Sequence, residues 1–149
     1  MKPVQLIDFT EPGEPGKERR LVEKVVRAVG DRLQGEALER MKTAVSEAVM
    51  NAIEHGNRNL PDRPVRVEVE SAGGCVIVRV TDYGSGQPIP EMTSPDIEAI
   101  LAEEARPRGW GLFLIRNMSD AFHIINGVDF HTVEMVFYTE SGENDCKNA

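Results

Sequence analysis

The feature that most constrains the fold is a helical apolar stripe in residues 38–56. Its apolar members recur three or four residues apart: Leu38, Met41, Ala44, Val45, Ala48, Val49, Ala52 and Ile53. This spacing is typical of an amphipathic helix with one broad face against a core. Gly56 is expected as the C′ residue that ends this helix, with His55 as a capping cation in its last turn.

A polar seam runs along the edge of that stripe. Glu47, Asn51 and His55 recur every fourth residue, so at about 100° per residue they share one side of the helix. Glu and Asn are unfavourable where a helix enters a core unless a polar group meets them. A carboxylate one turn from a carboxamide offers a proton acceptor beside a neutral ligand for phosphate-bound Mg²⁺. Taken alone, the pair is more simply explained as a border with solvent.

Size and charge bound the class of protein. The chain has 149 residues, 40% of them hydrophobic and 28% charged, as in one ordinary soluble domain. We expect a single domain over residues 1–149, with a core of about 4–139 and a polar tail at 140–149. The net charge of −8 argues against nucleic-acid binding, which needs a basic face, and suits a protein that meets other proteins.

The sequence predicts a cytoplasmic protein with no membrane partner. No apolar run approaches the roughly 20 residues that cross a bilayer, and the first residues lack a signal-peptide hydrophobic region. The two cysteines show no metal or redox spacing, and Cys75 is expected in a strand. His123 and His131 show no ligand spacing with His55, so we expect both to be structural or solvent-facing.

Alternating and helical patterns divide the rest of the chain. Strands are expected at residues 4–9, 65–70, 75–81, 122–125 and 133–138, and a further helix at 17–33. Residues 87–108 contain four prolines and are the least regular stretch. They could form a lid over a site or an ordinary surface excursion, with a short helix at 96–104.

A glycine motif, Asp82-Tyr-Gly-Ser-Gly86, directly follows the strand expected inside the sheet. Gly84 and Gly86 permit backbone conformations and close ligand approach that side chains would forbid. Asp82 could accept a hydrogen bond from an exocyclic amine, such as that of adenine. Alone, the motif is more often a simple turn.

A second glycine pair, Gly109 and Gly111, opens a helix whose apolar face includes Leu112. The free N–H groups at the start of such a helix are a natural seat for phosphate. Arg106 and Arg108 precede the pair and add positive charge that the acidic chain otherwise lacks.

Together the three motifs are specific, although each is weak alone. Glu47-x-x-x-Asn51 on a helix, Asp82-x-Gly-x-Gly86 after a strand and Arg108-Gly-Trp-Gly111 opening a helix resemble the ATP-binding boxes of the GHKL ATPase superfamily. Over roughly residues 4–139 the chain is similar in particular to bacterial anti-sigma factor serine/threonine kinases. The resemblance implies an α+β fold, a two-layer α/β sandwich of the Bergerat type with helices on one face of a mixed, mainly antiparallel sheet.

The resemblance also implies a role for the residues of the first two motifs. Glu47 would be the catalytic base, and Asn51 would bind Mg²⁺. Asp82 would read the adenine amine, while Gly84 and Gly86 would shape the base pocket.

The last motif would hold the phosphates. Gly109 and Gly111 would wrap them, and either Arg106 or Arg108 would meet the γ-phosphate. The family usually carries a Gly-Thr-Thr-like box before its last strand. The corresponding stretch here, Asp-Phe-His-Thr-Val, keeps only Thr132 in a recognisable place as a nucleotide contact.

The leading hypothesis from this resemblance is an ATP-dependent protein serine/threonine kinase that uses ATP and Mg²⁺. It would phosphorylate a STAS-type anti-sigma factor antagonist and sequester an RNA polymerase sigma factor, in a family where homodimers are common. The alternative is a nucleotide-binding partner-switching module without phosphotransfer, which the altered last box favours. The ATP-binding half of a histidine kinase ranks lower, because no helical segment with a phospho-accepting His is expected ahead of the domain.

Overall fold

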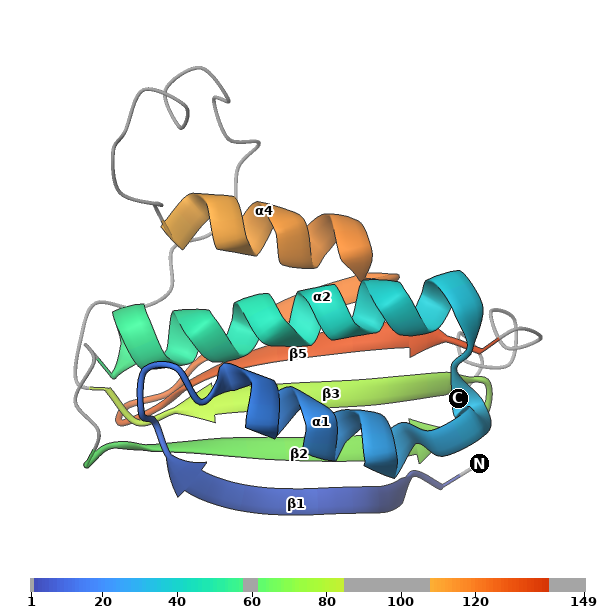
Figure 1. The fold of residues 1–149 in the computed structure, drawn as a ribbon, viewed down its shortest axis with the longest axis horizontal. Coiled ribbons are helices and arrows are strands. Elements are labelled where there is room, and N and C mark those ends of the chain that lie inside the picture. Colours follow the sequence, from blue (N-terminus) through green and yellow to red (C-terminus); the bar gives the residue numbers. More distant parts are fainter. Residues whose placement is uncertain (1, 58–61, 85–107, 140–149) are drawn as a thin grey trace.

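The computed structural model describes residues 2–57, 62–84 and 108–139, which form two layers (Figure 1). Their strands are β1 (Val4–Pro12), β2 (Pro64–Ala72), β3 (Cys75–Asp82), β4 (Ala121–Asn126) and β5 (His131–Tyr138). Their α-helices are α1 (Glu18–Val29), α2 (Gly35–Asn51) and α4 (Arg108–Met118), all on one face of the sheet. The strand order is β1-β2-β3-β5-β4, and every pairing among these strands is antiparallel. The expected α+β sandwich is confirmed.

The core lies between the helices and the inner face of the sheet. Alternate residues of the two central strands point into it and are at most 2% exposed: Val65, Val67, Val69, Val76, Val78 and Val80. They meet the predicted apolar stripe of α2 and the apolar face of α1. Each such side chain, fully buried, stabilises the fold by roughly 1.5–3 kcal/mol. The interior position expected for the strand after the first hairpin is confirmed, since β3 lies between β2 and β5.

Ion pairs cover the face of the sheet that points away from the helices. Arg66 Nη2 lies 2.7 Å from Asp8 Oδ2 across the β1–β2 pair. Arg79 reaches Glu134 Oε2 at 2.7 Å and Glu70 Oε1 at 3.0 Å. Burial lowers the pKa of Arg79, but its hydrogen bonds with Glu134 and Glu70 outweigh burial and raise that pKa above the ordinary value. The guanidinium therefore stays charged between its two carboxylates.

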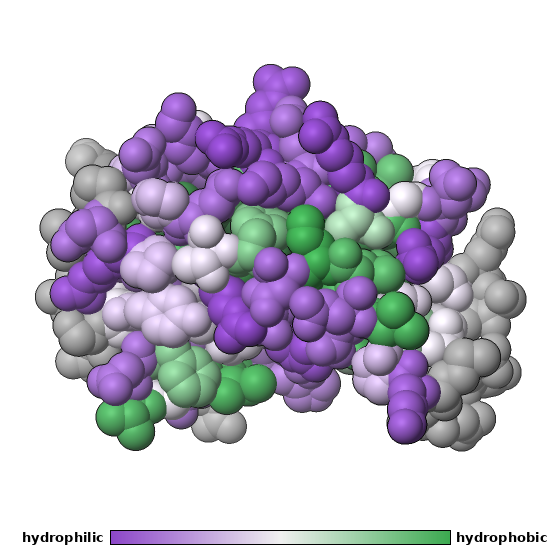
Figure 2. Space-filling view, turned by 90° about the horizontal axis from the view of Figure 1, so that it is seen from below, coloured by the Kyte–Doolittle hydropathy of each residue, from purple (hydrophilic) through white to green (hydrophobic). Residues whose placement is uncertain are grey.

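The described surface is mostly hydrophilic when it is seen from the β1 edge, with hydrophobic side chains gathered across the middle of this view (Figure 2). Among the described residues, no helix combines the length and the apolar character needed to span a membrane.

The end of the central helix differs from the expectation. Regular α-helix stops at Asn51, and Ala52–Gly56 form a π-helical turn that contains His55. Gly56 is not among the glycines with positive φ, and the turn ends at Asn57, whose N–H donates to the carbonyl of Ala52 at 2.7 Å. The prediction that Gly56 acts as a C′ cap is therefore wrong. The short helix expected at 96–104 lies outside the described residues.

Candidate functional site

Asn51 is buried at the last position of α2, directly before the π-helical turn. Its side chain is 6% exposed, and its amide nitrogen Nδ2 has no hydrogen-bond partner among the described residues. An unsatisfied buried N–H costs roughly 1–3 kcal/mol, so a partner supplied by a ligand would recover that cost. π-Helical turns are frequent at functional sites, because the extra residue redirects the neighbouring side chains.

Gly111, in the first turns of α4, packs against that carboxamide. A Cβ atom at this position would lie 2.9 Å from Nδ2 and 3.2 Å from Oδ1 of Asn51. The absence of a side chain thus lets the start of α4 approach the end of α2, and the structure brings the first and third motifs together. Arg108 and Gly109 begin α4.

Asp82 ends β3 with its carboxylate buried on the inner face of the sheet, at 3% exposure. A Cβ at Gly56 would lie 2.2 Å from Asp82 Oδ2, and one at Gly84 would lie 1.6 Å from the carbonyl oxygen of Gly56. The backbone N–H of Gly84 donates to Asp82 Oδ1 at 3.2 Å. Only glycines allow the π-helical turn to lie so close to this carboxylate, which explains why positions 56 and 84 are both glycine.

His131 is buried beside Asp82, a proximity that no sequence motif predicts. The two residues are partners in the β3–β5 register, and His131 Nδ1 lies 3.0 Å from Asp82 Oδ1. His131 is 5% exposed, whereas the side chain of His123 is 62% exposed and confirmed as solvent-facing. The signal that could have found His131 is the strand register, which places the start of β5 against the end of β3.

Thr132 points to the other face of the sheet. Successive strand residues face opposite sides, so Thr132 cannot share the face of His131 and Asp82. Its hydroxyl instead lies 2.7 Å from the Thr81 hydroxyl, and both residues are 6% exposed. The structure therefore does not bring Thr132 together with the other predicted site residues.

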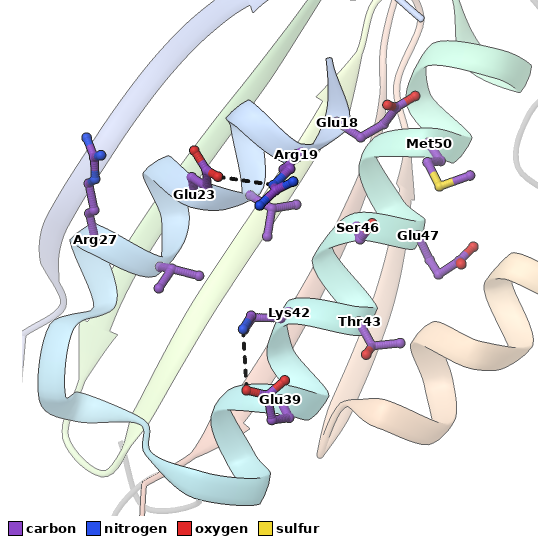
Figure 3. Close-up of a pocket in the computed structure, with 12 residues that line it drawn as sticks. Glu18, Arg19, Glu23, Arg27, Glu39, Lys42, Thr43, Ser46, Glu47 and Met50 are labelled. Atoms are coloured by element: carbon purple, nitrogen blue, oxygen red, sulfur yellow. Dashed lines mark hydrogen bonds and ion pairs between the residues drawn. The ribbon is translucent and has the colours of Figure 1, made fainter. Parts of the chain in front are cut away.

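Glu47 lies one turn before Asn51 and is half-buried. Its side chain leaves α2 on the side that faces α4 (Figure 3). It also lines an open groove of about 790 Å³ between α1 and α2, together with Ser46 and Met50. Neither Asn51 nor Asp82 lines this groove. Glu47 therefore connects the groove with the predicted nucleotide site, because it borders the groove and lies one turn from Asn51.

Two predicted residues fall outside the part of the chain that the structure describes, namely Gly86 and Arg106. Within the described ranges, no group of three or more His, Cys, Asp and Glu residues is placed to hold a metal ion. The carboxamide of Asn51 would offer one neutral oxygen, Oδ1. That fits Mg²⁺, which usually keeps several waters and takes phosphate oxygens as ligands.

Comparisons with known proteins identify the family of the chain. The family model of the histidine kinase-like ATPase domain matches residues 12–137. The anti-sigma F factor of Anoxybacillus flavithermus (strain DSM 21510 / WK1) is 32% identical over 111 residues, which are 73% of this chain and 75% of that relative. The serine-protein kinase RsbW of Listeria innocua is 34% identical over 88 residues, 57% of this chain and 56% of that relative.

A shorter match is more similar in sequence. The anti-sigma F factor of Clostridium botulinum (strain Eklund 17B / Type B) is 46% identical over 56 residues, and the matched part spans 37% of this chain and 39% of that relative. A crystal structure of the RsbU and RsbW domains of Rv1364c from Mycobacterium tuberculosis superimposes with a TM-score of 0.63 at 17% identity. It covers 93% of this chain and 33% of that one, and it shows that the fold is shared.

Proposed function

Because this chain belongs to the family of histidine kinase-like ATPase domains and is similar to anti-sigma F factors, we propose that it is an ATP-dependent protein serine/threonine kinase. One observation carries the proposal. The Asn51 carboxamide is buried, its Nδ2 lacks a partner among the described residues, and it lies against Gly111 at the start of α4. Such a group suits a phosphate-bearing ligand that enters between the two helices.

Asp82 is the group proposed to bind the adenine base. Its ionised carboxylate only accepts hydrogen bonds, and an exocyclic amine supplies a donor. Gly56 and Gly84 keep the surrounding backbone close enough for a flat base to reach the carboxylate. Gly86, which follows in the same motif, is proposed to extend this pocket.

The phosphate end is assigned to the start of α4. The unpaired N–H groups of a helix N-terminus favour anions, and Arg108 with Gly109 and Gly111 begins this helix. Either Arg106 or Arg108 is proposed to meet the γ-phosphate. Asn51 would hold Mg²⁺, which supplies the charge neutralisation that phosphoryl transfer requires.

Glu47 is proposed as the catalytic base. It would accept the proton of a serine or threonine hydroxyl as that oxygen bonds to the γ-phosphorus, while the bond to the ADP oxygen breaks and ADP leaves with the electron pair. Its position one turn from Asn51 and beside an open groove supports this role, because the acceptor protein must reach the same point. Such a base typically contributes about 10²- to 10⁴-fold to the rate.

The relatives' names guide the proposal for partners. Proteins named anti-sigma F factor and serine-protein kinase RsbW suggest a sigma factor as one partner and a protein serine as the phosphoryl acceptor. The resemblance of the sequence motifs implies that this acceptor is a STAS-type antagonist. The net charge of −8 fits protein partners better than nucleic acid. A cytoplasmic homodimer is part of the same proposal. Thr132 stays a predicted nucleotide contact that the register does not favour.

Calorimetric titration with ATP, with and without Mg²⁺, tests the proposal. Asn51→Ala is expected to remove most of the Mg²⁺-dependent part of the affinity while leaving the fold intact. Asn117→Ala is the matched control, because Asn117 carries an exposed carboxamide on α4 that donates to the Phe113 carbonyl at 2.8 Å. Unchanged Mg²⁺-ATP binding by Asn51→Ala would contradict the assignment of the site.

A further inference from the structure

We propose that His131 is a positioning residue that fixes the Asp82 carboxylate and thereby sets the preference of the site for a purine with an exocyclic amine. The inference rests on the proposed nucleotide-binding function and adds a residue to it. It starts from the pair itself, in which Nδ1 and Oδ1 are 3.0 Å apart and both residues are more than nine-tenths buried.

The contacts around Asp82 divide its two oxygens. Oδ1 accepts the N–H of Gly84 at 3.2 Å and lies next to the His131 ring. A Cβ added at Gly56 would come within 2.2 Å of Oδ2 and 2.6 Å of Oδ1, so this glycine lies against the whole carboxylate and closest to Oδ2. Gly84 and His131 therefore both hold Oδ1, whereas neither of these two contacts involves Oδ2. We assign Oδ2 as the oxygen that accepts the amine.

The chemistry of the pair fixes the tautomer of the ring. An ionised carboxylate has no hydrogen to donate, so Nδ1 must carry the proton that forms this hydrogen bond. The terminal torsion of an aspartate is broad and has no sharp preference of its own. Without the donor on His131, the carboxylate could rotate, and Oδ2 would lose its fixed direction toward the base.

A purely structural role for His131 can be distinguished with a second buried bond that joins the same two strands. On the opposite face of the β3–β5 pair, the hydroxyls of Thr81 and Thr132 already form a buried bond of 2.7 Å. That bond joins the neighbouring residue pair of the same register. Thr81→Val removes this bond without changing the Asp82 or His131 side chain, and so provides a matched control for a change at His131.

The test compares ATP with purine riboside triphosphate, which lacks only the exocyclic amine. The wild type is expected to prefer ATP by about 10- to 100-fold, the range for a hydrogen bond to a charged group. His131→Leu should lower this ratio at least about tenfold, mainly through weaker ATP binding. His131→Asn, which can place an amide N–H near the position of Nδ1, should retain most of the preference, and Thr81→Val should keep the wild-type ratio.

The outcomes separate this inference from the proposed function. A folded His131→Leu protein with the wild-type ratio would overturn the role of His131 alone. A wild type that binds neither nucleotide would overturn the proposed function, and equal binding of both would overturn the reading of the amine by Asp82 and with it this inference. If His131→Leu does not fold, ¹⁵N NMR of the wild-type imidazole decides: a protonated Nδ1 supports the proposal, and an unprotonated Nδ1 contradicts it.

Discussion

Gly111 lies so close to Asn51 that a Cβ atom would come within 2.9 Å of Nδ2 and 3.4 Å of Cγ. Glycine in a helix costs about 1 kcal/mol relative to alanine, so propensity alone disfavours this residue. The contact gives the physical reason for the glycine, which is the close approach of α4 to a buried polar group on α2.

Gly111→Ala is expected to weaken ATP binding by about tenfold or more. The added methyl group meets the movable end of the Asn51 side chain, so the carboxamide turns away while the backbone stays in place. Stability should change by less than about 1 kcal/mol, because better helix propensity offsets the local crowding. Thermal unfolding and nucleotide titration of the same sample check both parts, and a variant with wild-type affinity would remove Asn51 from the site.

Gly84→Ala should behave in the opposite way. Its Cβ would lie 1.6 Å from the carbonyl oxygen and 2.4 Å from the carbonyl carbon of Gly56, which are backbone atoms that cannot simply rotate aside. We expect a loss of several kcal/mol in the free energy of unfolding, above the usual range for a point mutation. Urea denaturation measures it. A loss below about 1 kcal/mol would show that the π-helical turn does not press on the end of β3.

The elements of the fold could be predicted because their signals are local. The apolar period of α2 and the strict alternation in β2 identify the core residues without any knowledge of their neighbours. Asn51 and Gly111 each belong to a short local motif, and the structure places these two residues against each other. The end of α2 could not be predicted in this way, because a π-helical turn inserts an extra residue without a distinctive sequence pattern.

The pairing of Asp82 with His131 depends on a strand register between residues 49 positions apart. The family resemblance predicted Thr132, which directly follows His131 in β5. A step of one residue along a strand moves the side chain to the other face of the sheet. His131 therefore faces the helices with Asp82, whereas Thr132 faces Thr81 on the other side.

Asp8→Asn should reveal a pH-dependent contribution of the sheet's outer face. The hydrogen bond from Arg66 lowers the pKa of Asp8 in the folded protein, against a smaller opposing effect of burial. Folding therefore favours the ionised carboxylate. The stabilisation is complete above the pKa of an unfolded aspartate, about 3.9, and is lost as the pH falls through the lower folded pKa.

At pH 7 the wild type should accordingly have a higher melting temperature than Asp8→Asn. The difference should correspond to less than about 1 kcal/mol in the free energy of unfolding, because the Asp8–Arg66 pair is partly exposed. This difference should shrink as the pH falls below about 4. Melting curves of both proteins across this range check it, and a difference that stays constant to pH 3 would show that the ion pair contributes nothing.

The most direct measurement of the central claim follows the γ-phosphate. The wild type and Glu47→Gln are incubated with γ-labelled ATP, Mg²⁺ and a lysate of the source cells. The proposal predicts that the wild type labels a small protein on serine or threonine, and that Glu47→Gln binds ATP normally but labels it about 10²- to 10⁴-fold more slowly. Equal labelling by both proteins would contradict the role of Glu47, and tight ATP binding with no labelled protein would identify a nucleotide-binding partner-switching module instead of a kinase.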